Sequence, residues 1–214
     1  YIEALKDHVS ETSYKLQLFV PFLSLLKSSG DSSLTVGVLH LLQGIVAAGR
    51  QQCAGQTQNP CFTLLERHGF SDAVIHLQAS SDGDVQRVAN DCVLKCEILQ
   101  NVFAELQSGD CGTAATAAGR LRQSLQACAS EAVLSAALSA NVATTLVRHL
   151  PSSALSVGDD CAACLGLLAA CACKRRDATS GAAALAQMVQ LLHDAISRDS
   201  SGKYPLFHSF ISVL

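Results

Sequence analysis

Residues 69–96 read GFSDAVIHLQASSDGDVQRVANDCVLKC, and this stretch decides the fold of the chain. The apolar segment Phe70–Leu77 is followed by a turn over residues 79–84 that is rich in Ser, Asp and Gly. Such residues end one helix and cap the next. The stretch therefore predicts a short helix, a turn in which Asp84 is the N-cap, and a longer helix. The apolar residues of the longer helix recur at helical spacing and are Val85, Ala89, Cys92, Val93 and Cys96.

The same arrangement recurs at other places in the chain. The segments Leu18–Leu26, Val142–Leu150 and Leu185–Leu192 each precede a polar turn. A short and a long amphipathic helix cannot bury their apolar faces alone, but stacked copies bury them against one another. We therefore expect an all-α solenoid of about four units. The core positions of two further long helices are Leu34, Val38, Leu41, Leu42 and Ile45, and Val157, Cys161, Cys164, Leu165 and Leu168.

The segments between these units are less regular. Residues 97–141 are expected to hold extra helices or a degenerate repeat, with Thr113–Ala129 as the clearest helix. Arg120 and Arg122 are predicted to lie on its solvated face. A last long helix is expected to begin near Leu206. Connecting loops are predicted at Gly49–Pro60, Ser108–Gly112 and Lys174–Gly181.

The composition favours a folded helical domain. Apolar residues make up 49% of the 214 residues, charged residues 15% and aromatic residues 5%. Disordered chains have low hydrophobicity and high charge, so disorder is excluded. The length suits one sizeable core, so we expect a single domain over residues 1–214 that is part of a longer chain. The formal net charge of -3 provides no basic footprint for nucleic acid.

Ten cysteines occur in the chain, and several fall on predicted apolar faces. Cys92 and Cys96 are four residues apart, and Cys161 and Cys164 are three apart. Reduced cysteine behaves as a small hydrophobic residue and is often buried. The sequence also has no Asn-x-Ser/Thr glycosylation site. These observations predict reduced thiols and a reducing compartment, the cytoplasm.

The segment Ser32–Gly49 carries no formal charge and raises the question of a membrane span. A spanning helix needs about 20 predominantly apolar residues. The apolar part is Leu34–Ala48, and His40 and Gln43 interrupt it. We therefore predict a buried core helix. The chain begins at Tyr1 without Met, so the sequence does not exclude a targeting segment before it.

The residues Gly69–Leu77 and Asp82–Cys96, with their copies, resemble the armadillo repeat, a three-helix unit of about 42 residues that is close to the HEAT repeat. The resemblance lies in hydrophobic spacing over nearly the whole chain. It implies a right-handed α-solenoid in which the long helices line a concave groove that binds extended peptides or partner helices. Mapped onto this sequence, it places three stripes in the groove: Val36, His40 and Gly44; Arg87, Asp91 and Lys95; and Asp159, Ala163 and Leu167.

Importin-like armadillo proteins carry ladders of Asn and Trp in this groove. The Asn positions here hold Gly44, Lys95 and Leu167, so the resemblance does not extend to nuclear-signal binding. An amphipathic helix or a folded partner suits the groove better. Alternatively, some of these residues pack against repeats outside this chain. The resulting candidate binding residues are His40, Arg87, Asp91, Lys95, Asp159 and Leu167.

The motif Cys161-Ala162-Ala163-Cys164, followed by Cys171 and Cys173, suggests metal or redox chemistry at first sight. A zinc site needs four ligands that converge, which one continuous helix does not allow. A redox cysteine needs a low pKa, which the preceding Asp159 and Asp160 disfavour. The seven histidines form no metal-ligand or catalytic group. We therefore expect no metal, no cofactor and no enzymatic activity.

Two short motifs leave alternatives open. Residues 174–176, Lys-Arg-Arg, are interpreted as cations at a helix C-terminus, with a basic partner patch or targeting signal as the alternative. Residues 212–214, Ser-Val-Leu, belong to the expected last helix or form a PDZ-ligand terminus.

Three functions are compatible with these patterns. The first is a non-enzymatic adaptor or scaffold that binds a peptide or amphipathic helix of another protein. The second is an Hsp70-type or myosin-type chaperone cofactor, since several of these resemble this fold. The third is a thiol-redox enzyme that uses Cys161 and Cys164. Neither nucleic acid nor a membrane span is expected.

Overall fold

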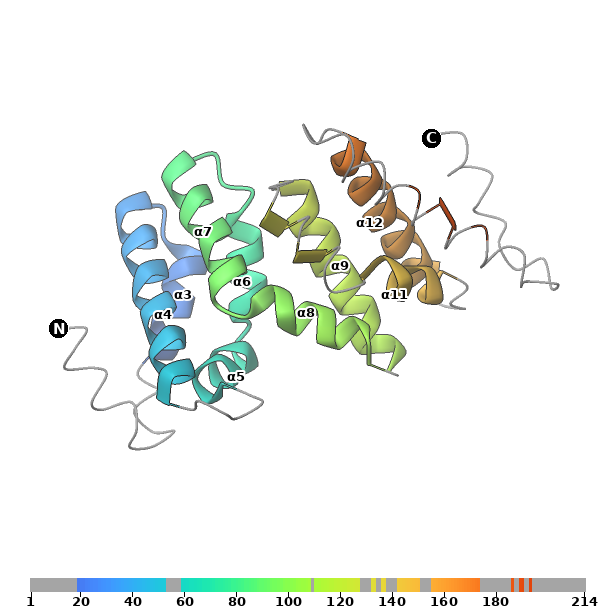
Figure 1. Ribbon diagram of the computed structural model, residues 1–214. Helices are drawn as coiled ribbons and strands as arrows, with labels where there is room; N and C mark the ends of the chain where they lie inside the picture. Colours follow the sequence, from blue (N-terminus) through green and yellow to red (C-terminus); the bar gives the residue numbers. More distant parts are fainter. Residues whose placement is uncertain are drawn as a thin grey trace. The chain divides into compact units, whose positions relative to one another are not determined.

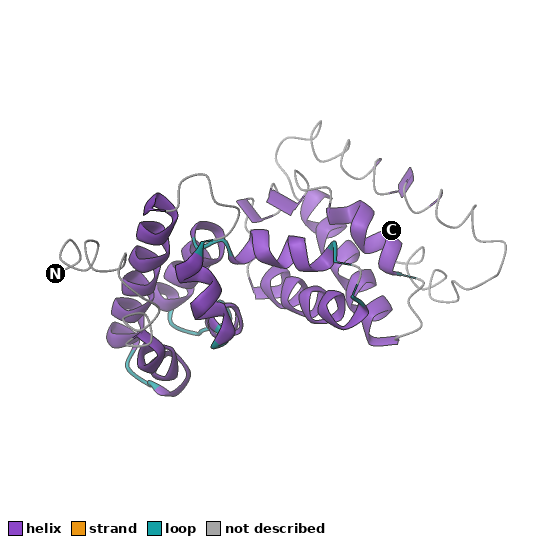
Figure 2. Cartoon of the chain, turned by 90° about the horizontal axis from the view of Figure 1, so that it is seen from below, coloured by secondary structure: helices purple, strands orange, loops and turns teal. Residues whose placement is uncertain are grey.

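The computed structural model describes residues 19–52, 59–108, 110–127, 132–133, 136–137, 142–150, 155–173, 186, 189–190 and 193. All regular elements in these ranges are helices, so the predicted all-α class is confirmed (Figures 1 and 2). In chain order the helices are α3 (Val20–Ser28), α4 (Ser32–Gln52), α5 (Pro60–Arg67), α6 (Phe70–Leu77), α7 (Gly83–Lys95), α8 (Ile98–Leu106), α9 (Cys111–Ala127), α11 (Val142–His149) and α12 (Leu155–Cys173).

The chain divides into two compact units, residues 1–99 and 100–214. In the first unit α4 packs against α3, α5 and α7, and α6 packs against α7. In the second unit α12 packs against α9 and α11. Three predicted pairs of a short and a long helix are therefore present, namely α3 with α4, α6 with α7, and α11 with α12.

The first unit is organised around the two long helices α4 and α7, which run in the same direction. At their N-terminal ends, the Ser32 side chain of α4 hydrogen-bonds Asp82, the N-cap of α7. Further along both helices, the Cys92 thiol lies 3.9 Å from the Leu39 carbonyl oxygen. At the C-terminal ends, Arg50 pairs with Glu97. The core residues predicted on α7 are all buried: Val85, Ala89, Cys92, Val93 and Cys96.

The predicted core stripe of α4 needs one correction. Val38, Leu42 and Ile45 are buried as expected, but Leu34 is 44% exposed. Thr35 is buried instead and continues the stripe one turn before Val38. The apolar face is therefore rotated slightly from the position that Leu34 and the half-buried Leu41 had suggested.

Polar side chains in the turns start four of these helices. Asp31, Asn59, Asp82 and Asp110 each accept hydrogen bonds from backbone N–H groups in the first turn of the helix that follows. The prediction that Asp84 caps α7 is wrong. Asp82 Oδ1 accepts from the backbone nitrogens of Asp84 and Val85 at 2.9 and 3.1 Å, so α7 begins at Gly83.

Several predicted loop boundaries also shift. Helix α4 continues through the expected start of the loop at Gly49, and α9 begins at Cys111 rather than after Gly112. The predicted loop at Lys174–Gly181, the last helix from Leu206 and the motif at residues 212–214 lie outside the described residues. The fourth unit, Leu185–Leu192, is described at Ala186, Val189 and Gln190 alone, and these are helical.

Candidate partner-binding surface

The outward face of α7 carries a row of four charged residues, which we call the α7 charge ladder. Its members follow one another at spacings of three and four, so they share one side of the helix. Their signs alternate from the N-terminal end to the C-terminal end. The exposed fractions of the side chains are 76% for Asp84, 69% for Arg87, 47% for Asp91 and 59% for Lys95.

Each charge of the ladder has a partner within the same helix. Arg87 Nη2 lies 3.0 Å from Asp84 Oδ1, and Lys95 Nζ lies 2.6 Å from Asp91 Oδ2. The hydrogen bond to Asp91 raises the pKa of Lys95. Water screens such exposed pairs, so they contribute little to the stability of the fold. The ladder is therefore a charged surface that the fold does not need.

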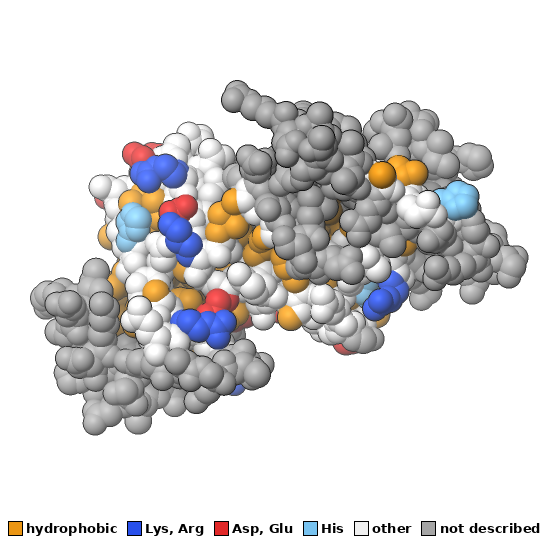
Figure 3. Space-filling view, viewed as in Figure 1, with side chains coloured by type: hydrophobic (Ala, Val, Ile, Leu, Met, Phe, Trp, Pro, Cys, Tyr) orange, Lys and Arg blue, Asp and Glu red, His pale blue; other side chains and the backbone are white. Residues whose placement is uncertain are grey.

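Helix α4 lies beside α7 and presents small groups. His40 is exposed, and Val36 and Gly44 are half-buried. A Cβ atom placed on Gly37 or Gly44 would meet no heavy atom within 4 Å. Figure 3 shows acidic and basic side chains next to each other on the face over α4 and α7. This part of the first unit is thus open and charged without being strongly acidic or basic.

The remaining predicted residues lie on α12 in the second unit. Asp159 is exposed, and Ala163 and Leu167 are half-buried. The structure therefore leaves all six candidate residues at least partly accessible. It brings together four of them, His40, Arg87, Asp91 and Lys95, in the first unit. A groove that runs along all the long helices stays a prediction.

One polar cluster in the first unit was missed by the sequence analysis. Asn59 is buried, and its Nδ2 donates to the Val46 carbonyl at 2.8 Å and to Glu97 Oε1 at 3.1 Å. Glu97 also pairs with Arg50 at 2.9 Å and has a left-handed backbone, with φ of 64°. Asn followed by Pro60 is an N-cap followed by the first residue of a helix, a signal that could have revealed α5.

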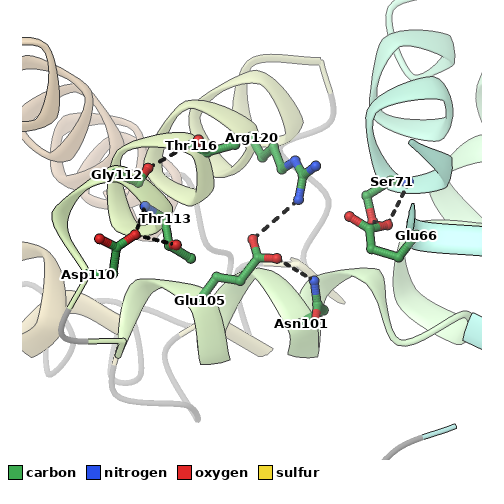
Figure 4. A network of polar contacts seen from close by, with 9 residues as sticks. All are labelled: Glu66, Ser71, Asn101, Glu105, Asp110, Gly112, Thr113, Thr116 and Arg120. Carbon is green, nitrogen blue, oxygen red and sulfur yellow. Dashed lines mark hydrogen bonds and ion pairs between the residues drawn. The ribbon is translucent and has the colours of Figure 1, made fainter. Parts of the chain in front are cut away.

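The predicted solvated position of Arg120 on α9 is wrong, whereas the Arg122 side chain is 39% exposed and is paired as well. Only 14% of the Arg120 side chain is exposed, and its Nη1 lies 3.2 Å from Glu105 Oε2 on α8. Figure 4 shows Glu105 between Arg120 and Asn101, whose Nδ2 donates to Oε1 at 2.8 Å. Arg122 pairs with Asp160 of α12 at 2.7 Å. These charges join helices, which a reading of one helix face alone does not reveal.

The cysteines of α12 are part of its packing. Cys161 and Cys164 are buried, and the Cys164 thiol contacts the Ala118 carbonyl oxygen of α9 at 3.5 Å. Burial, with a smaller effect of Asp160, raises the pKa of Cys161 to about 12. Burial also raises the pKa of Cys164. Both thiols are protonated at neutral pH, which does not favour thiol-redox chemistry. The side chains of Cys171 and Cys173 lie outside the described part.

The described residues contain no group of three or more His, Cys, Asp or Glu that could hold a metal ion. One helix of the described part, over Ser32–Gln51, is long and apolar enough to cross a membrane. Core helices of soluble proteins meet the same criterion, and this helix packs against α3, α5 and α7. That packing favours the interpretation as a core helix.

No family model and no curated protein matches the chain. Two solved structures of engineered proteins from the Northeast Structural Genomics Consortium are similar over 99% of this chain. The first is 16% identical, is covered over 86% of its length and gives a TM-score of 0.42. The second is 17% identical, is covered over 53% and gives a TM-score of 0.43.

Proposed function

We propose that this chain is a non-enzymatic protein-interaction module, an adaptor or scaffold, that binds a partner protein along the outward faces of its long helices. In this proposal the helix pairs are armadillo-like repeats of a right-handed α-solenoid, about four in number. The partner surface includes His40 and the α7 charge ladder in the first unit, and Asp159 and Leu167 in the second. The module works in the reducing environment of the cytoplasm.

The observation that carries this proposal is the α7 charge ladder. Four charged side chains occupy one face of a core helix, yet each is paired within that helix and is 47% exposed or more. A helix needs only a polar outer face for solubility, and charged residues in any order of sign would provide it. An ordered alternation of signs offers a partner a specific electrostatic pattern, which fixes register and excludes wrong partners.

The burial of the thiols supports the choice of compartment. Cys92, Cys96, Cys161 and Cys164 are not joined in disulfides and are fully buried in the helix packing. The hydrogen bond that the Cys96 thiol donates to Cys92, together with burial, raises the pKa of Cys96. Such cysteines act as small core residues.

The test is capture of bound proteins from reduced cell lysate, with identification by mass spectrometry. The wild-type chain is compared with the double variant Arg87→Glu/Lys95→Glu. A matched control, Arg67→Glu/Arg148→Glu, makes the same change of charge at two exposed positions on other helices, α5 and α11. We expect a protein that is captured by the wild type and the control and is lost with the ladder variant. Equal capture by all three chains would contradict the proposed surface.

A further inference from the structure

The order of signs along the α7 charge ladder has a symmetry that points to its partner. Read toward the C-terminus, the signs are negative, positive, negative and positive, at Asp84, Arg87, Asp91 and Lys95. Read in the opposite direction, they are positive, negative, positive and negative. A ladder laid antiparallel on a copy of itself therefore places an opposite charge at every step.

The register of this pairing is consistent along the helix. Asp84 faces Lys95 of the second copy, and Arg87 faces its Asp91, with the reciprocal two pairs following from the two-fold axis. The midpoint of the Asp84–Lys95 pair falls between Ala89 and Asn90, and that of the Arg87–Asp91 pair falls at Ala89, half a residue away. One axis near Ala89 therefore serves all four contacts. A parallel arrangement would place like charges opposite each other. The charge pattern thus selects one orientation.

The neighbouring surface permits a close approach. Beside the ladder, α4 presents Gly37 and Gly44, over which there is open space, and the exposed Ala47. His40, which lies between Gly37 and Gly44 on the same side of α4, is the larger exposed side chain of this stripe, and the small groups on either side of it leave room for a second α7 helix. The ladder spans about 16 Å of helix, so the charge contacts alone cover a small area.

We propose that the partner bound at the α7 charge ladder is a second copy of this chain, held antiparallel by four reciprocal ion pairs. This inference rests on the proposed function, because it names the partner of the same surface. The dimer is weak and salt-sensitive, since exposed ion pairs are screened by salt. Each existing pair within α7 becomes part of a network of charges that spans both copies.

The test uses sedimentation of the purified chain at high protein concentration in reducing buffer. At low salt the wild type and the control Arg67→Glu/Arg148→Glu form a dimer, which dissociates at high salt. Asp84→Lys alone and Lys95→Asp alone place like charges opposite each other, and we expect dimerisation at least about tenfold weaker. An equimolar mixture of these two variants restores every opposite pair and should form a heterodimer with wild-type affinity.

A mismatched mixture tests the register. Asp84→Lys mixed with Arg87→Asp leaves two like-charge pairs in the antiparallel register and should not associate. The inference is overturned if the wild type is monomeric at low salt, if its dimer resists high salt, or if both mixtures behave alike. A monomeric wild type whose lysate partner is lost with Arg87→Glu/Lys95→Glu would overturn the dimer and leave the proposed function intact.

Discussion

Helix α7 of the first unit and helix α9 of the second unit use charge in opposite ways. On α7 of the first unit, oppositely charged residues pair within one helix and stay exposed. In the second unit, the charged residues of α9 reach to other helices, Arg120 to Glu105 of α8 and Arg122 to Asp160 of α12. In both of these bridges, at least one side chain is less than 20% exposed.

This difference separates charges that serve the fold from charges available for binding. Removing one partner of a partly buried bridge leaves the other poorly solvated, which destabilises the protein. Removing one partner of an exposed pair costs little, because water replaces it. The comparison therefore predicts that substitutions on α9 affect folding and that substitutions on the α7 charge ladder affect binding.

The packing between α9 and α12 provides the largest expected effect. Cys164→Asp would bury a carboxylate among apolar side chains, because Cys164 has no exposed surface. We expect a loss of more than about 3 kcal/mol of folding free energy, or failure to fold. Cys164→Ala is the control and should cost about 1 kcal/mol. A circular-dichroism melt of Cys164→Asp that matches the wild type would contradict the burial of Cys164 between α12 and α9.

Two glycines of α4 give a matched pair with opposite expected signs. A Cβ on Gly49 would lie 2.5 Å from Asn59 Oδ1 and 2.6 Å from Cys61 Sγ, both at the start of α5. Gly49→Ala should therefore destabilise the first unit by about 1–3 kcal/mol.

Gly44→Ala should instead stabilise it by about 0.5–1 kcal/mol, because alanine favours the helix and meets no neighbour. Urea unfolding followed by far-ultraviolet circular dichroism measures both changes. Equal effects at the two positions would contradict the close contact of α4 with α5.

Single arginine truncations test the comparison directly. Arg120→Ala removes a cation that is 14% exposed and leaves Glu105 without it, so we expect a loss of about 1–3 kcal/mol. Arg87→Ala removes a cation that is 69% exposed and should change stability by no more than about 0.5 kcal/mol. Thermal or urea unfolding of the two variants measures both losses of stability. A larger loss for Arg87→Ala than for Arg120→Ala would show that the ladder stabilises the fold.

The smallest expected effect is a dependence of stability on pH at the start of α7. The Ser32 side chain and the backbone nitrogen of Val85 hydrogen-bond Asp82 and lower its pKa from the ordinary value of 3.8. A carboxylate with a lowered pKa stabilises the fold above its unfolded pKa, and this contribution is lost as pH falls through the lowered value.

We therefore expect the thermal midpoint of the wild type to fall below pH 4 more steeply than that of Asp82→Asn, whose cap does not titrate. Thermal melts at a series of pH values measure the difference. If the thermal midpoints of the two proteins fall in parallel, Asp82 does not contribute to the dependence of stability on pH.

The sequence predicted the features that depend on one helix at a time. Periodicity placed Val85, Cys92 and Cys164 in the core, and the polar turns separated three pairs of helices. The armadillo resemblance placed Arg87, Asp91 and Lys95 of the α7 charge ladder on one exposed stripe, whereas Asp84 was predicted as the N-cap. These properties follow from local geometry.

Features that depend on contacts between distant segments were not predictable in this way. Arg120 has the sequence context of a surface residue, and only the approach of α8 makes it a bridge. Asn59 starts α5 and also binds the α4 backbone and Glu97, which is 38 positions further along the chain. The sequence contains the alternating signs of the ladder. These charges can pair with a second copy only where the face is exposed, and the structure shows that exposure.

The central claim is that the α7 charge ladder serves binding and the α9 bridges serve folding. The most direct measurement is urea unfolding of two variants with the same change of charge, Arg87→Glu/Lys95→Glu and Arg120→Glu/Arg122→Glu. We predict that the first keeps a midpoint close to that of the wild type and that the second unfolds at much lower urea. A large loss of stability in the ladder variant, with the α9 variant unaffected, would contradict the claim.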